Sequence, residues 1–180
     1  HRRDAAELDR AAVYSSNQLR AQMDGALHAI RAVSSLFTSG REVTREEFRD
    51  AAEAWLEPPS QLQALGWSEI IGTAELPRFE ARAHAEGFSG LRVMSADGRG
   101  GLRSVRPDEP LAVIRFVEPL AQNRLAPGIN SRANPMAAAA IERALAGHGV
   151  SATSSFPLLL PAAFGAPESG VVLYRAVSAS

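Results

Sequence analysis

The sequence predicts an α+β fold in which a long N-terminal helix precedes a domain built on an antiparallel sheet of about five strands. Three observations support this class. Residues 4–37 contain no proline and a single glycine, and their apolar residues recur at helical spacing. Leu111–Val117 is a short apolar run, rich in β-branched and aromatic residues, with a proline near each end. Similar short runs, separated by turn residues, follow in both directions along the chain.

Composition restricts the possible functions. A chain of 180 residues can hold one domain with a good core or two small ones. The net charge of −1 gives no electrostatic argument for binding nucleic acid or an anionic membrane surface, and we expect no nucleic-acid partner. The absence of cysteine excludes disulfides and thiolate chemistry and leaves the redox compartment open.

No apolar run approaches the roughly 20 residues needed to cross a bilayer, and no signal peptide is visible. Because the chain opens at His1 without methionine, we expect it to be a processed or truncated piece of a longer protein.

The predicted first helix would be about 50 Å long at ~1.5 Å per residue, longer than a small domain can cover. Its first half is therefore expected to project. Residues 1–10 are strongly charged, which fits a solvated helix start or a juxtamembrane segment, and the two are compatible. Gly40 is a plausible left-handed cap at the end. The apolar positions of this helix are Leu8, Ala12, Leu19, Met23, Leu27, Ile30, Val33 and Phe37.

The second helix has a clear start, because Thr44 and Glu47 have the spacing of a capping box. Its end is set by the prolines at 58 and 59. A first strand is predicted within residues 62–71. A third helix is predicted at about residues 76–86, with Thr73 as its cap and Gly87 as its stop.

The second half of the chain is predicted to be mainly strands around one helix. Residues 91–95 are a predicted strand, residues 96–101 a flexible turn, and residues 111–117 a strand covered on both faces. Asn134 and Pro135 suit the first positions of a helix over residues 136–146. The last two predicted strands span residues 151–160 and 171–177.

Arg115 stands among aliphatic residues of the 111–117 strand, so it must pair, extend to solvent or face a cavity. Strict alternation places Arg115 and Phe116 on opposite faces. We expect Phe116 to point inward, because a buried arginine without an identified acidic partner is costly.

The sequence contains no pattern that indicates a catalytic site or a metal site. The four histidines are far apart and lack metal-ligand spacing. Glu46 and Glu47 are neighbours on a helix and point in different directions, and the serines at 154 and 155 lack the context of a nucleophile. We expect no enzyme activity in this chain and no cofactor.

Several short segments carry a family resemblance through their order and spacing: Leu65-Gly66-Trp67, Phe79-Glu80, Glu118-Pro119, Asn123-Arg124-Leu125, Gly128-Ile129-Asn130, Asn134-Pro135, Thr153-Ser154-Ser155-Phe156 and Gly170-Val171-Val172-Leu173. Together with the Ala-rich helix after Pro135, they resemble the CHASE domain over roughly residues 60–177. CHASE domains are extracytoplasmic sensory modules of bacterial histidine kinases and cyclases and of plant cytokinin receptors.

The resemblance implies a stalk and dimerisation helix at residues 1–40 and a PAS-like sensory domain at residues 41–180. It further implies the periplasmic or extracellular part of an inner-membrane protein, with flanking membrane helices and a kinase or cyclase output domain in the full-length chain. A parallel homodimer through the stalk helix is expected. The alternative is a PAS-like module with a filled core that serves only dimerisation or protein interaction.

The resemblance also implies a site for a small ligand, such as an adenine-type cytokinin or another small aromatic or apolar compound. Asp108 stands where plant receptors place the aspartate that contacts the adenine ring, although Pro-Asp-Glu-Pro is also ordinary turn chemistry. Arg115 would serve an anionic group of the ligand if its face were the inner one. The expected ligand-binding residues are Asp108, Val113, Phe116, Thr153, Ser155 and Phe156; for the last three, a core strand with exposed hydroxyls is an equally open interpretation.

The chain departs from the family pattern at two positions. Asn130 replaces the usual aspartate, and Ala137 or Ala138 replaces an arginine early in the following helix. In relatives these two residues could form a buried ion pair. Losing both together leaves no unpaired charge, so the fold is expected to tolerate the change.

Overall fold

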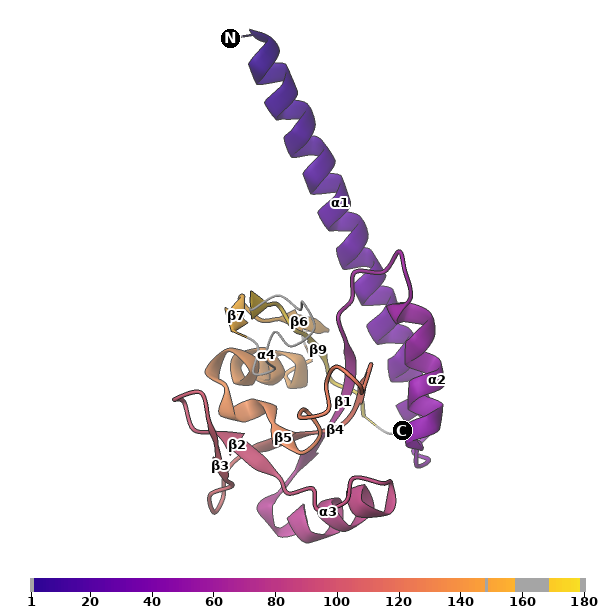
Figure 1. Ribbon diagram of the computed structural model, residues 1–180, viewed down its shortest axis with the longest axis vertical. Coiled ribbons are helices and arrows are strands. Elements are labelled where there is room, and N and C mark those ends of the chain that lie inside the picture. The colour runs from indigo at the N-terminus through magenta and orange to yellow at the C-terminus, as the bar shows by residue number, and fades with distance from the viewer. Residues whose placement is uncertain (1, 148, 158–168, 179–180) are drawn as a thin grey trace.

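The computed structural model describes residues 2–147, 149–157 and 169–178. Its most extended element is helix α1 (Arg2–Ser34), which continues into a short 3-10 turn, η1 (Ser35–Phe37). Figure 1 shows the amino-terminal part of α1 extending well away from the rest of the molecule. Only the last turns of this helix lie against the domain, as the length of its pattern predicts.

Three shorter helices follow, α2 (Arg45–Leu56), α3 (Leu76–Ala85) and α4 (Pro135–Leu145). The predicted capping box of α2 is confirmed, because the Thr44 N–H donates to the Glu47 carboxylate at 2.9 Å and the Glu47 N–H donates to the Thr44 hydroxyl at 3.2 Å. Thr73 as the cap of α3 is wrong. Thr73 begins a 3-10 turn, η2 (Thr73–Glu75), and the Glu75 carboxylate accepts the N–H of Gly72 at 2.8 Å.

The main sheet has five strands in the order β1-β4-β5-β2-β3. Neighbouring strands are antiparallel except for the parallel pair β2–β5. The predicted fold class, a long helix followed by an α+β domain with about five mostly antiparallel strands, is confirmed. The strands are β1 (Leu65–Ile71), β2 (Met94–Ala96), β3 (Leu102–Ser104), β4 (Leu111–Glu118) and β5 (Ile129–Asn130).

The region before β4 differs from the prediction. β2 begins at Met94 rather than at Leu91, and the turn after it leads directly into β3, a strand that was not predicted. The Asp97 carboxylate holds this turn by accepting the N–H groups of Arg99 at 2.7 Å and Gly101 at 2.9 Å.

The C-terminal part forms two small two-stranded sheets beside α4 (Figure 1). One pairs β6 (Val150–Ala152) with β9 (Leu173–Arg175), and the other pairs β7 (Phe156–Pro157) with β8 (Ser169–Gly170). The predicted strand over residues 151–160 is thus divided in its described part, and its last three residues lie outside the described residues. Arg143 joins α4 to β6 by donating to the Ser151 hydroxyl at 3.0 Å.

Two apolar clusters fill one face of the main sheet. In the first, Phe116 of β4 packs on Phe48 of α2, with ring centroids 5.5 Å apart, and both side chains are fully buried. Phe37 belongs to the same cluster and stacks on Trp67 of β1. Burial of each large apolar side chain contributes about 1.5–3 kcal/mol. The second cluster lies under α3 and consists of Phe79, Val93, Leu111 and Val113.

A β-bulge changes the expected alternation of β4. Trp67 pairs with Phe116 and the next residue, Ser68, pairs with Ile114, so Arg115 is the extra residue. Arg115 and Phe116 consequently lie on the same face, and the Arg115 guanidinium is 4.7 Å from the centre of the Phe116 ring. The prediction that they point to opposite faces is therefore wrong.

Candidate functional site

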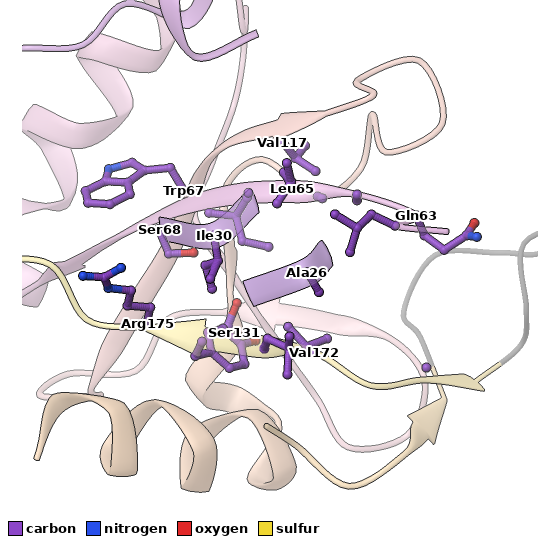
Figure 2. Close-up of a pocket in the computed structure, with 18 of the residues that line it drawn as sticks. Ala26, Ile30, Gln63, Leu65, Trp67, Ser68, Val117, Ser131, Val172 and Arg175 are labelled. Atoms are coloured by element: carbon purple, nitrogen blue, oxygen red, sulfur yellow. The ribbon is translucent and has the colours of Figure 1, made fainter. Parts of the chain in front are cut away.

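The opposite face of the main sheet borders a large cleft. Its volume is about 1850 Å³, and its walls come from α1, β1, β4, α4 and the segment that includes β9. Figure 2 shows Ala26 and Ile30 of α1, Ser68 of β1 and Val172 around the same space. Both tryptophans of the chain, Trp55 and Trp67, are among its lining residues.

The cleft wall is mainly aliphatic. The alanines of α4 leave this space open, because they fill little of the volume between helix and sheet. Three elements supply most of the apolar lining, namely α1 (Ala26, Ile30, Val33), β4 (Ala112, Ile114, Val117) and α4 (Ala137, Ile141, Ala144).

Neutral hydroxyl groups provide polarity inside the cleft. Ser68 and Ser131 line it from opposite sides in Figure 2. Burial raises the pKa of the Tyr174 hydroxyl, and a hydrogen bond with the Ser131 side chain partly offsets that rise. Tyr174 therefore remains neutral at physiological pH and can exchange hydrogen bonds with a ligand.

Charged groups are few on the described lining of the cleft. They are Glu57, Glu69, Glu75 and Arg175. Two of these carboxylates are engaged elsewhere, because Glu75 caps the N–H of Gly72 and Glu69 forms ion pairs on the other face of the sheet. The cleft therefore suits an uncharged, mostly apolar molecule with a few hydrogen-bonding groups.

The structure does not bring the six predicted ligand-binding residues together. Phe156 lines the cleft. Val113 and Phe116 are fully buried in the two apolar clusters on the opposite face of the sheet. Thr153 is buried, and its hydroxyl accepts the N–H of Val172 at 3.0 Å. Ser155 is exposed.

Asp108 lies at the tip of an exposed turn and has a positive φ of 58°, a conformation that aspartate tolerates better than most residues. It is not part of the cleft lining. The neighbouring Glu109 holds the turn in place, since its carboxylate accepts two hydrogen bonds from Arg103, at 2.8 and 2.9 Å, and one from the N–H of Arg106. The Arg103 hydrogen bonds lower the pKa of Glu109 to about 2.

Arg115 is buried beneath three carboxylates. Its guanidinium donates to Glu69 at 2.8 Å, to Glu42 at 3.3 Å and to Glu86. Burial alone would lower the pKa of Arg115, but the hydrogen bonds and charges of Glu86 and Glu69 outweigh it and raise that pKa. Arg115 thus has its own acidic partners and is not available to an anionic ligand in the cleft.

Sequence reasoning missed most of the cleft. Ile30, Ser68, Ser131 and Tyr174 line it, yet none belongs to a motif with a recognisable ligand-binding pattern. The α1 stripe was the one available signal, because an apolar stripe on a helix must be covered by something. In the structure, the carboxyl-terminal part of that stripe covers the cleft, through Ile30, and the domain core, through Val33 and Phe37.

Within the described ranges, no group of three or more His, Asp or Glu side chains is arranged to hold a metal ion. Among the helices that the structure describes, none is both long and apolar enough to span a membrane.

Comparison with known proteins identifies the family of this chain. The sequence model of the CHASE domain matches residues 41–180, most of the chain. No curated protein matches it. CHASE domains are extracytoplasmic sensory domains and not catalytic ones. The resemblance drawn from short segments is confirmed, and the chain belongs to the CHASE domain family.

Proposed function

We propose that this chain is the extracytoplasmic ligand-sensing domain of a membrane-bound receptor, either a histidine kinase or a nucleotide cyclase. The observation that carries the proposal is that α1 itself forms a wall of the cleft, through Ala26, Ile30 and Val33. A ligand in the cleft would contact the helix that leads out of the domain. In the full-length protein, membrane helices would flank this chain, which would lie on the periplasmic or extracellular side of the inner membrane.

The mechanism requires no chemistry from this chain. Residues 1–40 would act as the stalk and residues 41–180 as a PAS-like sensory domain. A ligand that binds one arrangement of α1 and the sheet more tightly than another shifts the population toward that arrangement. The amino-terminal half of α1 extends beyond the domain. A small tilt of α1 at the cleft would therefore displace the amino-terminal end of the helix, which would lead to the membrane.

We further propose that the cleft binds a ligand with a mostly apolar body and a few hydrogen-bonding groups. An adenine-type cytokinin or another small aromatic compound is the first class to test. The ring or chain would pack against Ile30 and Ile114, and the hydroxyls of Ser68 and Ser131 would bond its polar atoms. The site predicted from the resemblance, around Asp108, is the competing location.

Thermal-shift screening of adenine-type cytokinins and small aromatic or aliphatic compounds tests this function. Emission from Trp55 and Trp67 gives a second readout, because both line the cleft. Ser68→Phe, which fills the space, should abolish binding, whereas Asp108→Ala should leave the affinity within about twofold of the wild type. If Asp108→Ala removes binding and Ser68→Phe does not, the ligand site lies at the turn and the cleft is not the sensor.

A ligand-free dimerisation or interaction module is the second candidate. It is favoured by the buried Val113 and Phe116, which leave the helix-covered face of the sheet filled. The screen separates the two functions. If no compound stabilises the domain or changes its tryptophan emission while the chain still self-associates, the interaction module is the better description.

Both candidate functions, the ligand sensor and the ligand-free interaction module, include a parallel homodimer through α1. Leu19 and Met23 continue the apolar stripe at the amino-terminal end of the cleft wall and are exposed, at 60% and 40% of their possible surface. A second copy of α1 would cover them. Parallel association also brings both chains to the membrane in the same direction, as a receptor requires.

A further inference from the structure

We infer that the ligand of this cleft is a short extended peptide, bound as an added β-strand between the free edges of β1 and β9. The inference rests on the proposed function in one respect, namely that the cleft is the ligand site. It adds a recognition chemistry, in which backbone N–H and C=O groups of the protein bind the backbone of the ligand.

The first observation is how the walls line the cleft. All residues from Ser60 to Ile71 and from Gly170 to Val177 contribute to the lining, without alternation. By contrast, Ala112 and Ile114 of β4 line the cleft and Val113 between them does not. A strand that shows its face presents alternate residues, whereas a strand that shows its edge presents consecutive ones. β1 and β9 therefore turn their edges toward the cleft.

The second observation is the direction of the β4 hydrogen bonds. The N–H of Ala112 donates to the Asn130 side chain at 3.0 Å, and the C=O of Ile114 accepts from the N–H of Gly128 at 2.8 Å. Both groups point toward β5. Because backbone groups alternate along a strand, the intervening Val113 points toward β1.

The orientation of β1 follows from this pairing. Val113 pairs with Glu69, so Glu69 turns its backbone groups toward β4. The adjacent Ser68 and Ile70 then turn their N–H and C=O groups away from β4. Because β1 is the last strand of its sheet, no described strand occupies that side. Ser68 and Ile70 thus carry free edge groups beside the cleft.

The same reasoning applies to β9 on the other wall. The N–H of Thr153 donates to the C=O of Val172 at 2.9 Å, so Val172 faces β6. Leu173 and Arg175, one and three positions later, turn their backbone groups away from β6. In the described part of the chain β6 is the one strand that pairs with β9, so this second edge is also free. Figure 2 shows Ser68 and Arg175 at the same end of the space, on β1 and β9 respectively.

The ligand's chemistry follows from these walls. Two free edges provide donors and acceptors on both sides of an extended backbone, which a peptide satisfies along its length. Five extended residues span about 17 Å, which is shorter than the seven-residue β1. The volume of about 1850 Å³ also exceeds the roughly 300–1,000 Å³ of most small-molecule pockets. The aliphatic lining selects apolar, uncharged side chains.

The test uses a pool of end-blocked five-residue peptides made from valine, isoleucine, leucine, phenylalanine, serine and threonine. We expect at least one to raise the melting temperature of the domain and to shift the emission of Trp55 and Trp67. Hydrogen exchange should slow at the amides of Ser68 and Ile70. The same peptide with N-methylated backbone amides should bind at least tenfold more weakly, because it lacks the donors.

A matched pair of variants tests the edge itself. Ser68→Pro removes the outward N–H and should weaken peptide binding at least tenfold more than Ser68→Ala, which removes the hydroxyl but keeps that N–H. If Ser68→Pro does not fold, Arg175→Pro with Arg175→Ala as its control makes the same test on the opposite edge.

The inference is overturned if no peptide of the pool binds, or if the N-methylated peptide binds equally well. A non-peptide compound whose binding is lost in Ser68→Phe would overturn the peptide inference and keep the cleft as the sensor. If nothing binds in the cleft, both proposals fail.

Discussion

At the scale of single residues, buried polar groups hold the strands in register. Asn130 is almost completely buried, and its side-chain oxygen accepts the N–H groups of Ala112 at 3.0 Å and Arg132 at 3.1 Å. Its amide nitrogen donates to Ser95 and Pro110, both at 3.2 Å. An amide both donates and accepts, whereas an ionised aspartate in this position would have no proton to donate to the Pro110 carbonyl.

Glu109 predicts how stability depends on pH. Its pKa is about 2 in the folded protein, against an ordinary value of 4.5, because Arg103 binds the ionised form. A lowered folded-state pKa adds stability above pH ~4.5 and loses it as the pH falls toward 2. The contribution at pH 7 is on the order of 2 kcal/mol after allowing for solvent screening.

Urea unfolding of the wild type and Glu109→Gln between pH 7 and pH 2 measures this contribution. The stability difference between the two proteins should be largest at pH 7 and should shrink below pH 4.5. A difference that stays constant over this range would show that the Arg103 ion pair contributes nothing measurable.

The environment of Arg115 could not be predicted from the sequence. Its three acidic partners, Glu42, Glu69 and Glu86, are far apart in the chain and meet only after folding. The bulge that places Arg115 and Phe116 on one face is a property of the β1–β4 register and has no local signature. Asp108, in contrast, occupies the turn that its neighbouring prolines predict.

At the scale of elements, the sequence predicts those helices and strands whose signals lie within a few consecutive residues. The capping box at Thr44 and the apolar run of β4 are complete within a few residues, and both are found as predicted. β3 and β5 are only three and two residues long, and their existence depends on strands that are distant in the sequence. Short strands of this kind give too few residues for a periodic pattern.

The start of α4 gives an element-scale prediction. The Asn134 side chain accepts the N–H groups of Met136 at 2.9 Å and Ala137 at 3.3 Å, as the sequence predicts for an N-cap. Asn134→Ala should destabilise the domain by about 1 kcal/mol. Asn134→Ser keeps a capping oxygen and should lower the stability by only a few tenths of a kcal/mol. Thermal unfolding monitored by circular dichroism measures both. Equal melting temperatures for the alanine variant and the wild type would mean that the cap contributes nothing.

At the scale of the whole molecule, α1 has one apolar stripe with two environments. Val33 and Phe37 belong to the core of the domain, and Ile30 lines the cleft. Leu19 and Met23 continue the same stripe at the amino-terminal end of the cleft wall, where they are largely exposed. The sequence shows the stripe but not this division, because periodicity says which residues share a face and not what covers that face.

The division predicts which substitutions affect the proposed homodimer. Leu19→Asp and Met23→Asp should each weaken self-association at least tenfold without lowering the melting temperature, because they introduce a charge where a second α1 would pack. His28→Asp is the matched control, since His28 is exposed on the opposite side of α1 and should not affect association. Ile30→Asp places a charge at a less exposed position of the cleft wall and should impair ligand binding. Sedimentation equilibrium over a range of protein concentrations measures association. A wild type that remains monomeric at high concentration, or a His28→Asp variant that dissociates as readily as Met23→Asp, would exclude this face of α1 as the dimer interface.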